Sequence, residues 1–84
     1  MELVRACNKW KIHLPVNAVF RHKRSSNCYV IVDHVFNVAT EDIDIVYASA
    51  TNVKELQGIH FSRNASEFLA RFEPVHSSAI KTIC

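Results

Sequence analysis

The sequence predicts a mainly β fold in which antiparallel strands form one small sheet. A stretch dense in β-branched and aromatic residues, 28–38, is followed across a polar loop by a second such stretch, 43–48, and this arrangement is typical of a β-hairpin. The second arm alternates polar and apolar residues from Asp42 to Ile45, as a strand does when only one of its faces is buried. A chain of 84 residues has room for a single small core.

Shorter segments complete the predicted sheet. Residues 18–22 form an expected strand that enters a polar turn, 23–27, which contains no glycine. Gly58 is the only glycine in the chain and precedes another short strand, 59–61. Because glycine tolerates conformations that other residues avoid, we expect Gly58 at a positive φ or at a close approach of two backbones.

A short helix is predicted near the C-terminal end of the sheet. Asn64 and Glu67 have the spacing of a capping box, in which the asparagine accepts from an amide of the first turn and the glutamate reaches back to the asparagine amide. A helical turn near 65–70 should follow, and then an extended segment, 72–75, that contains Pro74. The side chains expected to face inward are Phe68, Leu69 and Phe72.

The first sixteen residues support two interpretations. Four apolar residues recur at helical spacing: Leu3, Cys7, Trp10 and Leu14. Residues 9–14 also alternate polar and apolar side chains, as a strand does. A short helix over 2–7 followed by a strand over 9–14, ended by Pro15, would reconcile the two patterns. Trp10 is expected in the core under either interpretation, because it is the largest apolar side chain available.

Cysteine usage and hydropathy indicate one cytoplasmic domain. The three cysteines, Cys7, Cys28 and Cys84, are odd in number and widely spaced, so we expect reduced thiols rather than a disulfide framework. Charges near the N-terminus are unlike a signal peptide, and no apolar run is long enough to cross a membrane. We expect one domain over residues 1–76, a flexible tail over 77–84 and no membrane partner.

The net charge of +2 conceals an asymmetry along the chain. Residues 1–24 contain six basic residues and one acidic residue, a balance of +5. The remaining sixty residues contain four basic and seven acidic residues, a balance of −3. Such a division is typical of a basic face for nucleic acid or for an acidic protein, and equally of an ordinary solvated surface.

No pattern in the sequence indicates catalysis or cofactor binding. Cys28 and His34 lie on one predicted strand, about 20 Å apart at the usual rise per residue, which is too far for a nucleophile and its base. The histidines and cysteines have neither C-x-x-C nor H-x-x-x-H spacing, the common arrangements of zinc ligands. We therefore expect no enzymatic activity, no cofactor and no metal site.

Three blocks of the sequence carry a resemblance to a known family. In order they are Val19–Lys23 (VFRHK), Ile45–Tyr47 (IVY) and His60–Phe68 (HFSRNASEF). They resemble the pattern Y-R-H-Y-K-G, then V-V-Y, then W-V-R-P-x-x-M-F, of short uncharacterised domains in bacterial and phage proteins. The chain lacks the glycine of the first block, and Asn64 replaces the proline of the third. Over residues 18–75, the resemblance implies a small SH3-like antiparallel barrel or a strongly bent sheet.

Two classes of function remain. The first is a non-enzymatic protein-interaction module, interpreted as a phage-encoded protein that binds and modulates or inhibits a host protein. The turn at 21–24 is expected to project cationic side chains into water and to contact an acidic patch on that protein. The second is nucleic-acid binding through the same turn and an exposed aromatic ring, which the modest net charge and the acidic second arm disfavour. The predicted partner-binding residues are Arg21, His22, Lys23, Arg24 and Arg63.

Overall fold

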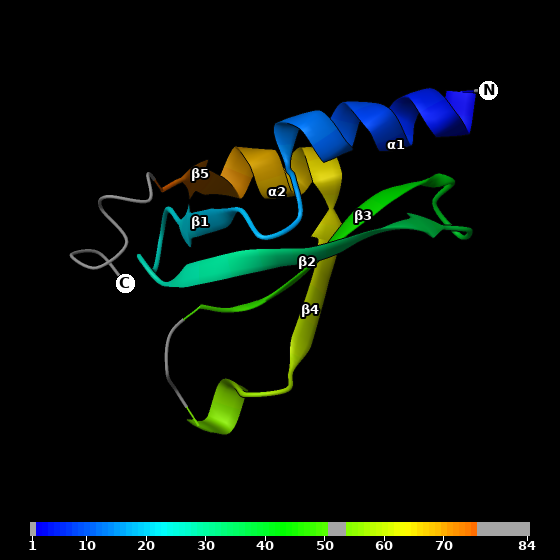
Figure 1. The fold of residues 1–84 in the computed structure, drawn as a ribbon. Coiled ribbons are helices and arrows are strands. Elements are labelled where there is room, and N and C mark those ends of the chain that lie inside the picture. The colour runs from blue at the N-terminus through cyan, green and yellow to red at the C-terminus, as the bar shows by residue number, and fades with distance from the viewer. Residues whose placement is uncertain (1, 51–53, 76–84) are drawn as a thin grey trace.

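A five-stranded antiparallel sheet forms the centre of the structure, and helices cover one of its faces (Figure 1). The computed structural model describes residues 2–50 and 54–75, without the side chains of residues 2–4, 6 and 7. The mainly β class predicted from the sequence is confirmed. In chain order the elements are α1 (Glu2–His13), β1 (Val19–His22), β2 (Cys28–Asn37), β3 (Asp42–Ser49), a 3-10 turn (Lys54–Leu56), β4 (His60–Asn64), α2 (Ala65–Arg71) and β5 (Phe72–Pro74).

The predicted hairpin is formed by β2 and β3. Their register runs from the pair Tyr29–Ser49 to the pair Asn37–Asp42, with a bulge between Ile31 and Asp33. A bulge adds a residue to one strand and increases the local twist. The two long strands consequently cross the whole molecule as a twisted ribbon (Figure 1).

The sheet is open rather than closed into a barrel. Its strand order is β4-β3-β2-β1-β5, and no pairing joins the edge strands β4 and β5 within the described residues. α2 connects these two edge strands directly, because Ala65 follows the last residue of β4 and Phe72 begins β5. Of the two sheet forms predicted, the structure is therefore the open one.

The turns rely on residues in the left-handed region as well as on glycine. Gly58 has a φ of 78° just before β4, as expected from its place in the sequence. Asn17, Ser26 and Glu41 have φ angles of 74°, 65° and 54°. Ser26 supplies the bend of the β1–β2 turn, and Glu41 that of the hairpin loop. A chain with one glycine can thus still make tight turns.

Both helices bury side chains against the same face of the sheet. Trp10 and Leu14 come from the α1 side, and Ala65 and Phe68 come from α2. Leu69, which was expected to face inward, is 45% exposed, because α2 turns only the face with Phe68 toward the sheet. The core cluster consists of Trp10, Leu14, Phe20, Ile31, Ile43, Ile45, Tyr47, Ala65, Phe68 and Phe72.

The predicted strand over 9–14 does not form, because α1 continues through His13. Trp10 and Leu14 are four residues apart and both are buried, which places them on one helical face. The Leu14 amide donates to the Trp10 carbonyl at 2.7 Å, and Pro15 follows. An amphipathic helix needs only a surface to pack on, whereas a strand would need a free sheet edge. The end of α1 is held to β2 by a hydrogen bond between His34 Nε2 and the Leu14 carbonyl.

The predicted helix cap is present. The Asn64 side-chain oxygen accepts from the amides of Ser66 and Glu67 at 3.0 and 3.4 Å. Asn64 also donates from Nδ2 to Asp42 at 2.8 Å, so the cap ties α2 to the start of β3. The Glu67 carboxylate does not complete the reciprocal half of the capping box among the described contacts, because it pairs with arginine side chains instead.

Cys28 corrects the expectation of three reduced thiols. Its side chain is fully buried at the first residue of β2 and is disulfide-bonded. Linear spacing could not reveal this, because pairing depends on which sulfurs meet in space. The side chains of Cys7 and Cys84, and the predicted tail 77–84, lie outside the described residues. Neither helix in the described part of the chain combines the length and apolar character of a membrane span.

Replacing Asn64 by alanine should destabilise the protein by about 1 kcal/mol, because α2 loses its cap. The bond to Asp42 is lost as well. Urea denaturation of Asn64→Ala and wild type measures the difference. Ser66→Ala is the matched control, since it retains the backbone amide that Asn64 caps, and it should change stability by less than about 0.5 kcal/mol. Equal losses in the two variants would show that α2 does not depend on the cap.

Stability should fall in acid through Asp42. The Asn64 hydrogen bond, followed by the Ile43 amide, lowers the pKa of Asp42 below its ordinary value of 3.8. A carboxyl with a lowered pKa in the folded state stabilises that state above its unfolded pKa, and the contribution is lost as pH falls through the folded pKa. We expect the stability difference between wild type and Asn64→Ala to narrow below about pH 4. Denaturation curves that keep the difference constant across that range would contradict this linkage.

Reductant should lower the melting temperature, because a disulfide restricts the unfolded chain and typically contributes roughly 2–4 kcal/mol. Thermal unfolding with and without reductant tests this directly. Cys28→Ser should melt at the same temperature in both conditions, and comparison of Cys7→Ser with Cys84→Ser identifies the paired cysteine. A wild-type melting temperature that reductant leaves unchanged would restore the expectation of reduced thiols.

Candidate functional site

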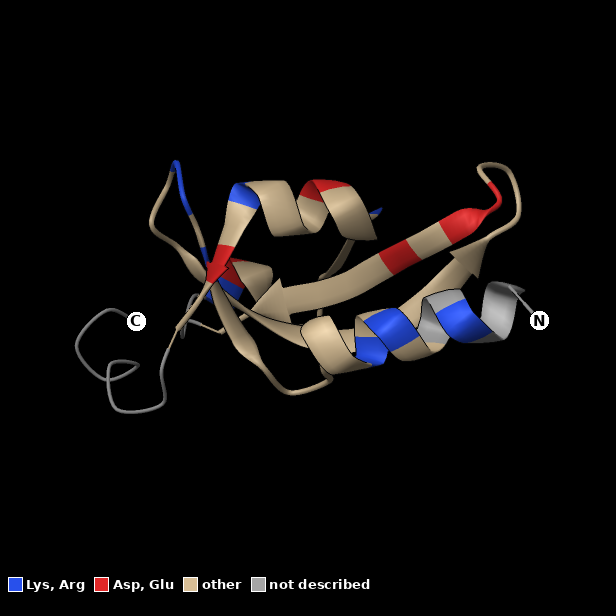
Figure 2. Ribbon diagram, turned by 90° about the horizontal axis from the view of Figure 1, so that it is seen from above, with Lys and Arg blue, Asp and Glu red and all other residues tan. Residues whose placement is uncertain are grey.

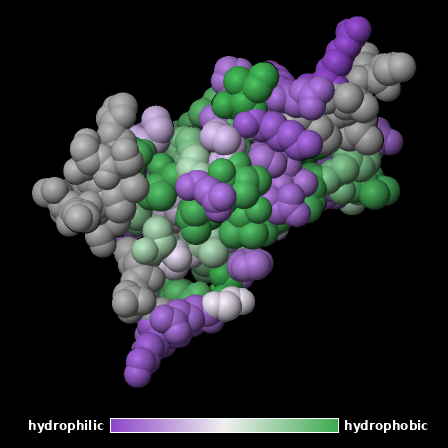
Figure 3. All heavy atoms as spheres, viewed as in Figure 1, coloured by the Kyte–Doolittle hydropathy of each residue, from purple (hydrophilic) through white to green (hydrophobic). Residues whose placement is uncertain are grey.

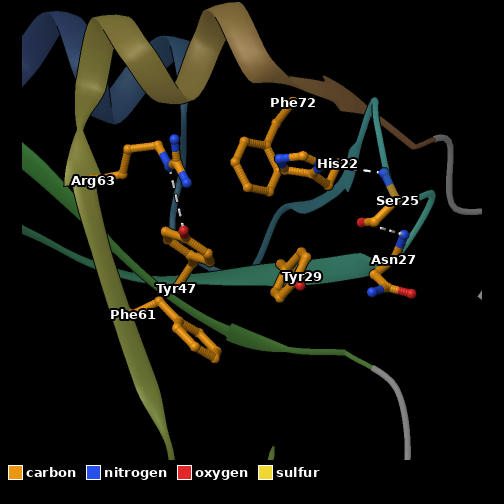
Figure 4. A pocket seen from close by; sticks show the side chains of 8 residues that line it. All are labelled: His22, Ser25, Asn27, Tyr29, Tyr47, Phe61, Arg63 and Phe72. Atoms are coloured by element: carbon orange, nitrogen blue, oxygen red, sulfur yellow. Dashed lines mark hydrogen bonds between the residues drawn. The ribbon is translucent and has the colours of Figure 1, made fainter.

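A pocket of about 330 Å³ lies between the β1–β2 turn and β4, on the side where the sheet stays open (Figure 4). Its volume lies near the lower end of the range for small ligand sites. The pocket brings together parts of the chain that are distant in the sequence. Its walls consist of His22, Ser25, Asn27, Tyr29, Tyr47, Phe61, Arg63 and Phe72.

Aromatic rings form the floor of the pocket. The Tyr29 ring meets Tyr47, Phe61 and Phe72 edge-on, with centroid distances of 5.4, 6.0 and 5.6 Å. Phe72 stacks in parallel on Phe68 of the core at 4.1 Å. Tyr47 and Phe72 are 5% and 2% exposed, whereas Tyr29 and Phe61 are partly buried. Because each ring is held by others, the floor is fixed by the core itself.

His22 forms one wall and organises the turn beside it. Its ring packs edge-on against Phe72 at 4.9 Å. Its Nδ1 accepts from the amides of Arg24 and Ser25 at 3.2 and 3.3 Å, and its carbonyl accepts from the Ser26 amide at 2.8 Å. A neutral imidazole that accepts at Nδ1 carries its proton on Nε2. His22 is half-buried rather than fully solvated. Its hydrogen bonds to the turn give it a structural role.

Arg63 forms the opposite wall, from β4. Its Nε donates to the Tyr47 hydroxyl at 3.5 Å and its Nη1 to Glu67 at 3.0 Å. The guanidinium also lies over the Phe72 ring, 5.9 Å from the centroid, within the range of a cation–π contact. The hydrogen bond to Tyr47 raises the pKa of Arg63, and attraction to Glu67 contributes in the same direction. The wall therefore carries a fixed positive charge.

Arg21 does not project into water as the sequence suggested. It lies directly opposite Glu73 in the β1–β5 pairing, and its Nε donates to the Glu73 carboxylate at 2.8 Å. A second bond joins Nη2 to the same oxygen. Alternation along β1 explains the difference, since cross-strand neighbours share one face of the sheet. Arg21 is therefore a link between β1 and β5, outside the walls of the pocket.

Lys23 and Arg24 do lie on the surface, in the turn that leads to the pocket wall. The Lys23 ammonium donates to the Ala70 carbonyl near the end of α2 at 3.2 Å, a favourable place for a cation. The Arg24 side chain is exposed. We name Lys23, Arg24 and Arg63 the cationic rim. Of the predicted site residues, His22 and Arg63 therefore line the pocket, Lys23 and Arg24 flank it, and Arg21 stands apart.

The aromatic floor was missed at the sequence level. Tyr47 and Phe61 belong to blocks singled out in the sequence, and the register pairs them directly across β3 and β4. Cross-strand partners point to the same face of a sheet. Pairing these two blocks as neighbouring strands would therefore have placed both rings together. Tyr29 and Phe72 join them only through the fold, so no spacing along the chain indicates them.

Basic residues of α1 lie alongside the acidic β2–β3 hairpin, and acidic residues of α2 and β5 lie toward the end with the β1–β2 turn, so each end of the molecule carries both signs of charge (Figure 2). Acidic residues lie at the tip of the β2–β3 hairpin, and the turn with Lys23 and Arg24 lies at the other end. On the face shown in Figure 3, apolar and polar side chains are interspersed. The acidic start of β3 therefore lies away from the β1–β2 turn, whereas Tyr47, farther along the same strand, lines the pocket.

Within the described residues, no three His, Cys, Asp or Glu side chains are grouped so that they could hold a metal ion. Comparisons of the chain with protein-family models, curated proteins and solved structures found no match. The resemblance to bacterial and phage domains consequently stays a prediction. The site combines an aromatic floor, hydrogen-bond donors and positive charge, and these properties determine what it can bind.

Reversing the charge of Arg21 should destabilise the protein by about 1 kcal/mol, because two carboxylates would then face each other across β1 and β5. Arg24→Glu, the matched control in the exposed turn, should change stability by less than about 0.5 kcal/mol. Urea denaturation measures both. The double reversal Arg21→Glu with Glu73→Arg should recover most of the loss. If the double variant were no more stable than Arg21→Glu alone, the ion pair would have no structural role.

Proposed function

We propose that this chain is a non-enzymatic protein-interaction module that binds an acidic surface of a partner protein through the aromatic pocket and its cationic rim. The observation that carries the proposal is that a single pocket is lined by Arg63, by residues of the β1–β2 turn and by an aromatic floor. Arginine and aromatic residues dominate the energetics of protein interfaces. A rigid floor with exposed cations beside it provides both an anchor point and long-range attraction.

The open sheet supports this function. A closed small barrel has an interior filled by its own side chains, whereas here the gap between β4 and the β1–β2 turn leaves space for part of another molecule. The strand order and the position of α2 are consistent with an SH3-like architecture that is open on one side. The module would therefore bind at the opening of its sheet, where edge and turn residues are accessible.

The biological setting follows from the resemblance in the sequence. We propose that the partner is a host protein, that a phage encodes the module and that binding modulates or inhibits the host protein. The disulfide-bonded Cys28 removes the support that cysteine usage gave to a cytoplasmic location. The exposed cations of the cationic rim support an acidic partner surface, because they would attract it and turn the β1–β2 turn toward it. The contact would therefore be oriented by electrostatics.

Nucleic-acid binding is the second candidate function. The observation that favours it is the position of Tyr29 and Phe61, which are partly buried aromatic residues beside the cationic rim. Cations and aromatic rings together form the usual surface for single-stranded nucleic acid. The acidic tip of the β2–β3 hairpin lies at the other end of the molecule from the β1–β2 turn, so it would repel phosphates at the pocket less than the sequence suggested. The number of cations in the rim is small, however, and affinity for phosphates depends on the number of such contacts.

Affinity capture from a bacterial lysate, with and without nuclease, tests the proposed function. The wild-type chain should retain a protein that nuclease treatment does not release. The double reversal Lys23→Glu/Arg24→Glu should lose that protein, because the rim then repels an acidic surface. The control Arg5→Glu/Lys11→Glu makes the same charge change at two exposed residues of α1 and should retain it.

Two results would overturn the proposal. Retention undiminished by the rim reversal, with both variants folded by circular dichroism, would move the contact to another surface. Retention abolished by nuclease, together with binding of the purified chain to single-stranded oligonucleotides that weakens steeply with salt, would select the nucleic-acid function instead.

A further inference from the structure

The polar groups that line the pocket share one property: none is acidic. The lining contains a guanidinium, an imidazole, a hydroxyl, an amide and two phenols, and the rest is aromatic hydrocarbon. The Glu67 carboxylate binds Arg63 from α2 but is not part of the lining. An arrangement of donors without a carboxylate favours a ligand that brings acceptors of its own.

Among the donors of the lining, those of Arg63, Tyr47 and His22 are relevant to such a ligand. Arg63 uses Nε for Tyr47 and Nη1 for Glu67, so the N–H groups of Nη2 are available. The Tyr47 hydroxyl accepts from Arg63, which leaves its proton to donate. His22 accepts at Nδ1 from the turn, and its ring lines the pocket edge-on against Phe72. Because Nδ1 accepts, the Nε2 N–H is the donor of this ring.

Cations and purely apolar groups fit this pocket poorly. A ligand cation would find aromatic faces, but the charged group of the lining is the Arg63 guanidinium, and no carboxylate of the lining would bind the cation. An apolar side chain would cover the donors of Arg63 and Tyr47 without replacing their hydrogen bonds to water, which is strongly unfavourable for a buried polar group. The pocket thus discriminates against both classes.

A nucleobase also fits poorly. Sequence-tolerant binding of bases needs an open ring face on which to stack. Tyr47 already lies against Phe61, with an interplanar angle of 28° and a centroid distance of 5.6 Å, and Phe72 uses one face for Phe68 at 4.1 Å. Tyr29 meets its three aromatic neighbours edge-on. The floor is well suited to hold the short stem of a side chain beneath a charged end.

We infer that the pocket binds a carboxylate of an extended peptide, with the carboxylate at Arg63, Tyr47 and His22 and the adjoining carbon atoms on the aromatic floor. The carboxylate comes either from an aspartate or glutamate side chain or from a C-terminus. A guanidinium held in place by Tyr47 and Glu67 is suited to this geometry, because charge-assisted bonds to a carboxylate are strong and directional. This inference rests on the proposed function and specifies its anchor.

Selection from a display library of random peptides, followed by binding measurements on synthetic versions, tests the inference. Each recovered peptide is compared with its C-terminal amide and with versions in which aspartate or glutamate is replaced by the corresponding amide residue. One of these neutral versions should bind the wild-type chain about ten- to a hundredfold more weakly. Loss with the C-terminal amide identifies a terminal carboxylate, and loss with asparagine or glutamine identifies a side chain.

Arg63→Met should weaken binding of the acidic peptide by a similar factor and remove its advantage over the neutral version. Arg71→Met is the matched control, because Arg71 also pairs with Glu67, at 3.2 Å, but does not line the pocket. It should leave both affinities unchanged. The comparison of acidic and neutral peptides uses the wild-type chain alone, so it decides the question even if Arg63→Met is unstable.

The possible failures are distinct. Peptides that bind the wild-type chain equally in acidic and neutral form, yet lose affinity with Lys23→Glu/Arg24→Glu, would overturn the carboxylate anchor and leave the protein-interaction function standing. Recovery of no peptide, together with binding of oligo-dT, would overturn both.

Discussion

The stacking of Phe72 on Phe68 is the contact on which the rest of the structure depends. The two rings are parallel and 4.1 Å apart, and both residues are buried. Phe68 belongs to α2, and Phe72 is the first residue of β5, so the stack fixes the angle at which the chain leaves the helix. It thereby sets β5 beside β1 and supplies part of the floor of the pocket. Edge-to-face contacts from Tyr47 to both rings, at 5.2 and 5.3 Å, attach the stack to the sheet.

The same aromatic cluster packs between α2 and the open sheet. α2 leads directly from one edge strand to the other, and its one aromatic side chain, Phe68, is buried in the core with Phe72 of β5. The pocket is what remains beyond the cluster, between Arg63 and the β1–β2 turn. Its floor belongs to the core, so its shape should be stable in the absence of a partner. Preorganisation of this kind reduces the conformational cost of binding.

Much of the fold could be predicted from the sequence, because its signals are local. The hairpin follows from strand propensity and alternation, and the start of α2 follows from the cap at Asn64. The N-terminal segment was misassigned in part, because the spacing of Trp10 and Leu14 fits a helix while their neighbours alternate. Only the surface available for packing decides between the two. The disulfide of Cys28 likewise depends on contacts that the order of residues does not reveal.

The candidate site was predicted only through its cationic and ionisable residues, and of these His22 and Arg63 line the pocket. Arg63 and the turn at 23–24 could be singled out as cationic groups in two separate blocks. The role of Arg21 could not, because it depends on the register that places Glu73 opposite. The aromatic floor requires five strands and a helix to be in place before its members meet. In the folded protein, the basic segment 21–24 thus contributes His22 to one wall of the aromatic pocket.

The central claim is that partner binding is confined to the pocket and its cationic rim. Nuclear magnetic resonance of the isotope-labelled chain, titrated with an acidic peptide recovered by selection, tests it most directly. The account predicts that the largest shift changes fall on Tyr29, on the turn from His22 to Asn27, and on the side-chain Nε–H of Arg63. Changes concentrated on α1 or at the tip of the β2–β3 hairpin, with Arg63 unaffected, would contradict it.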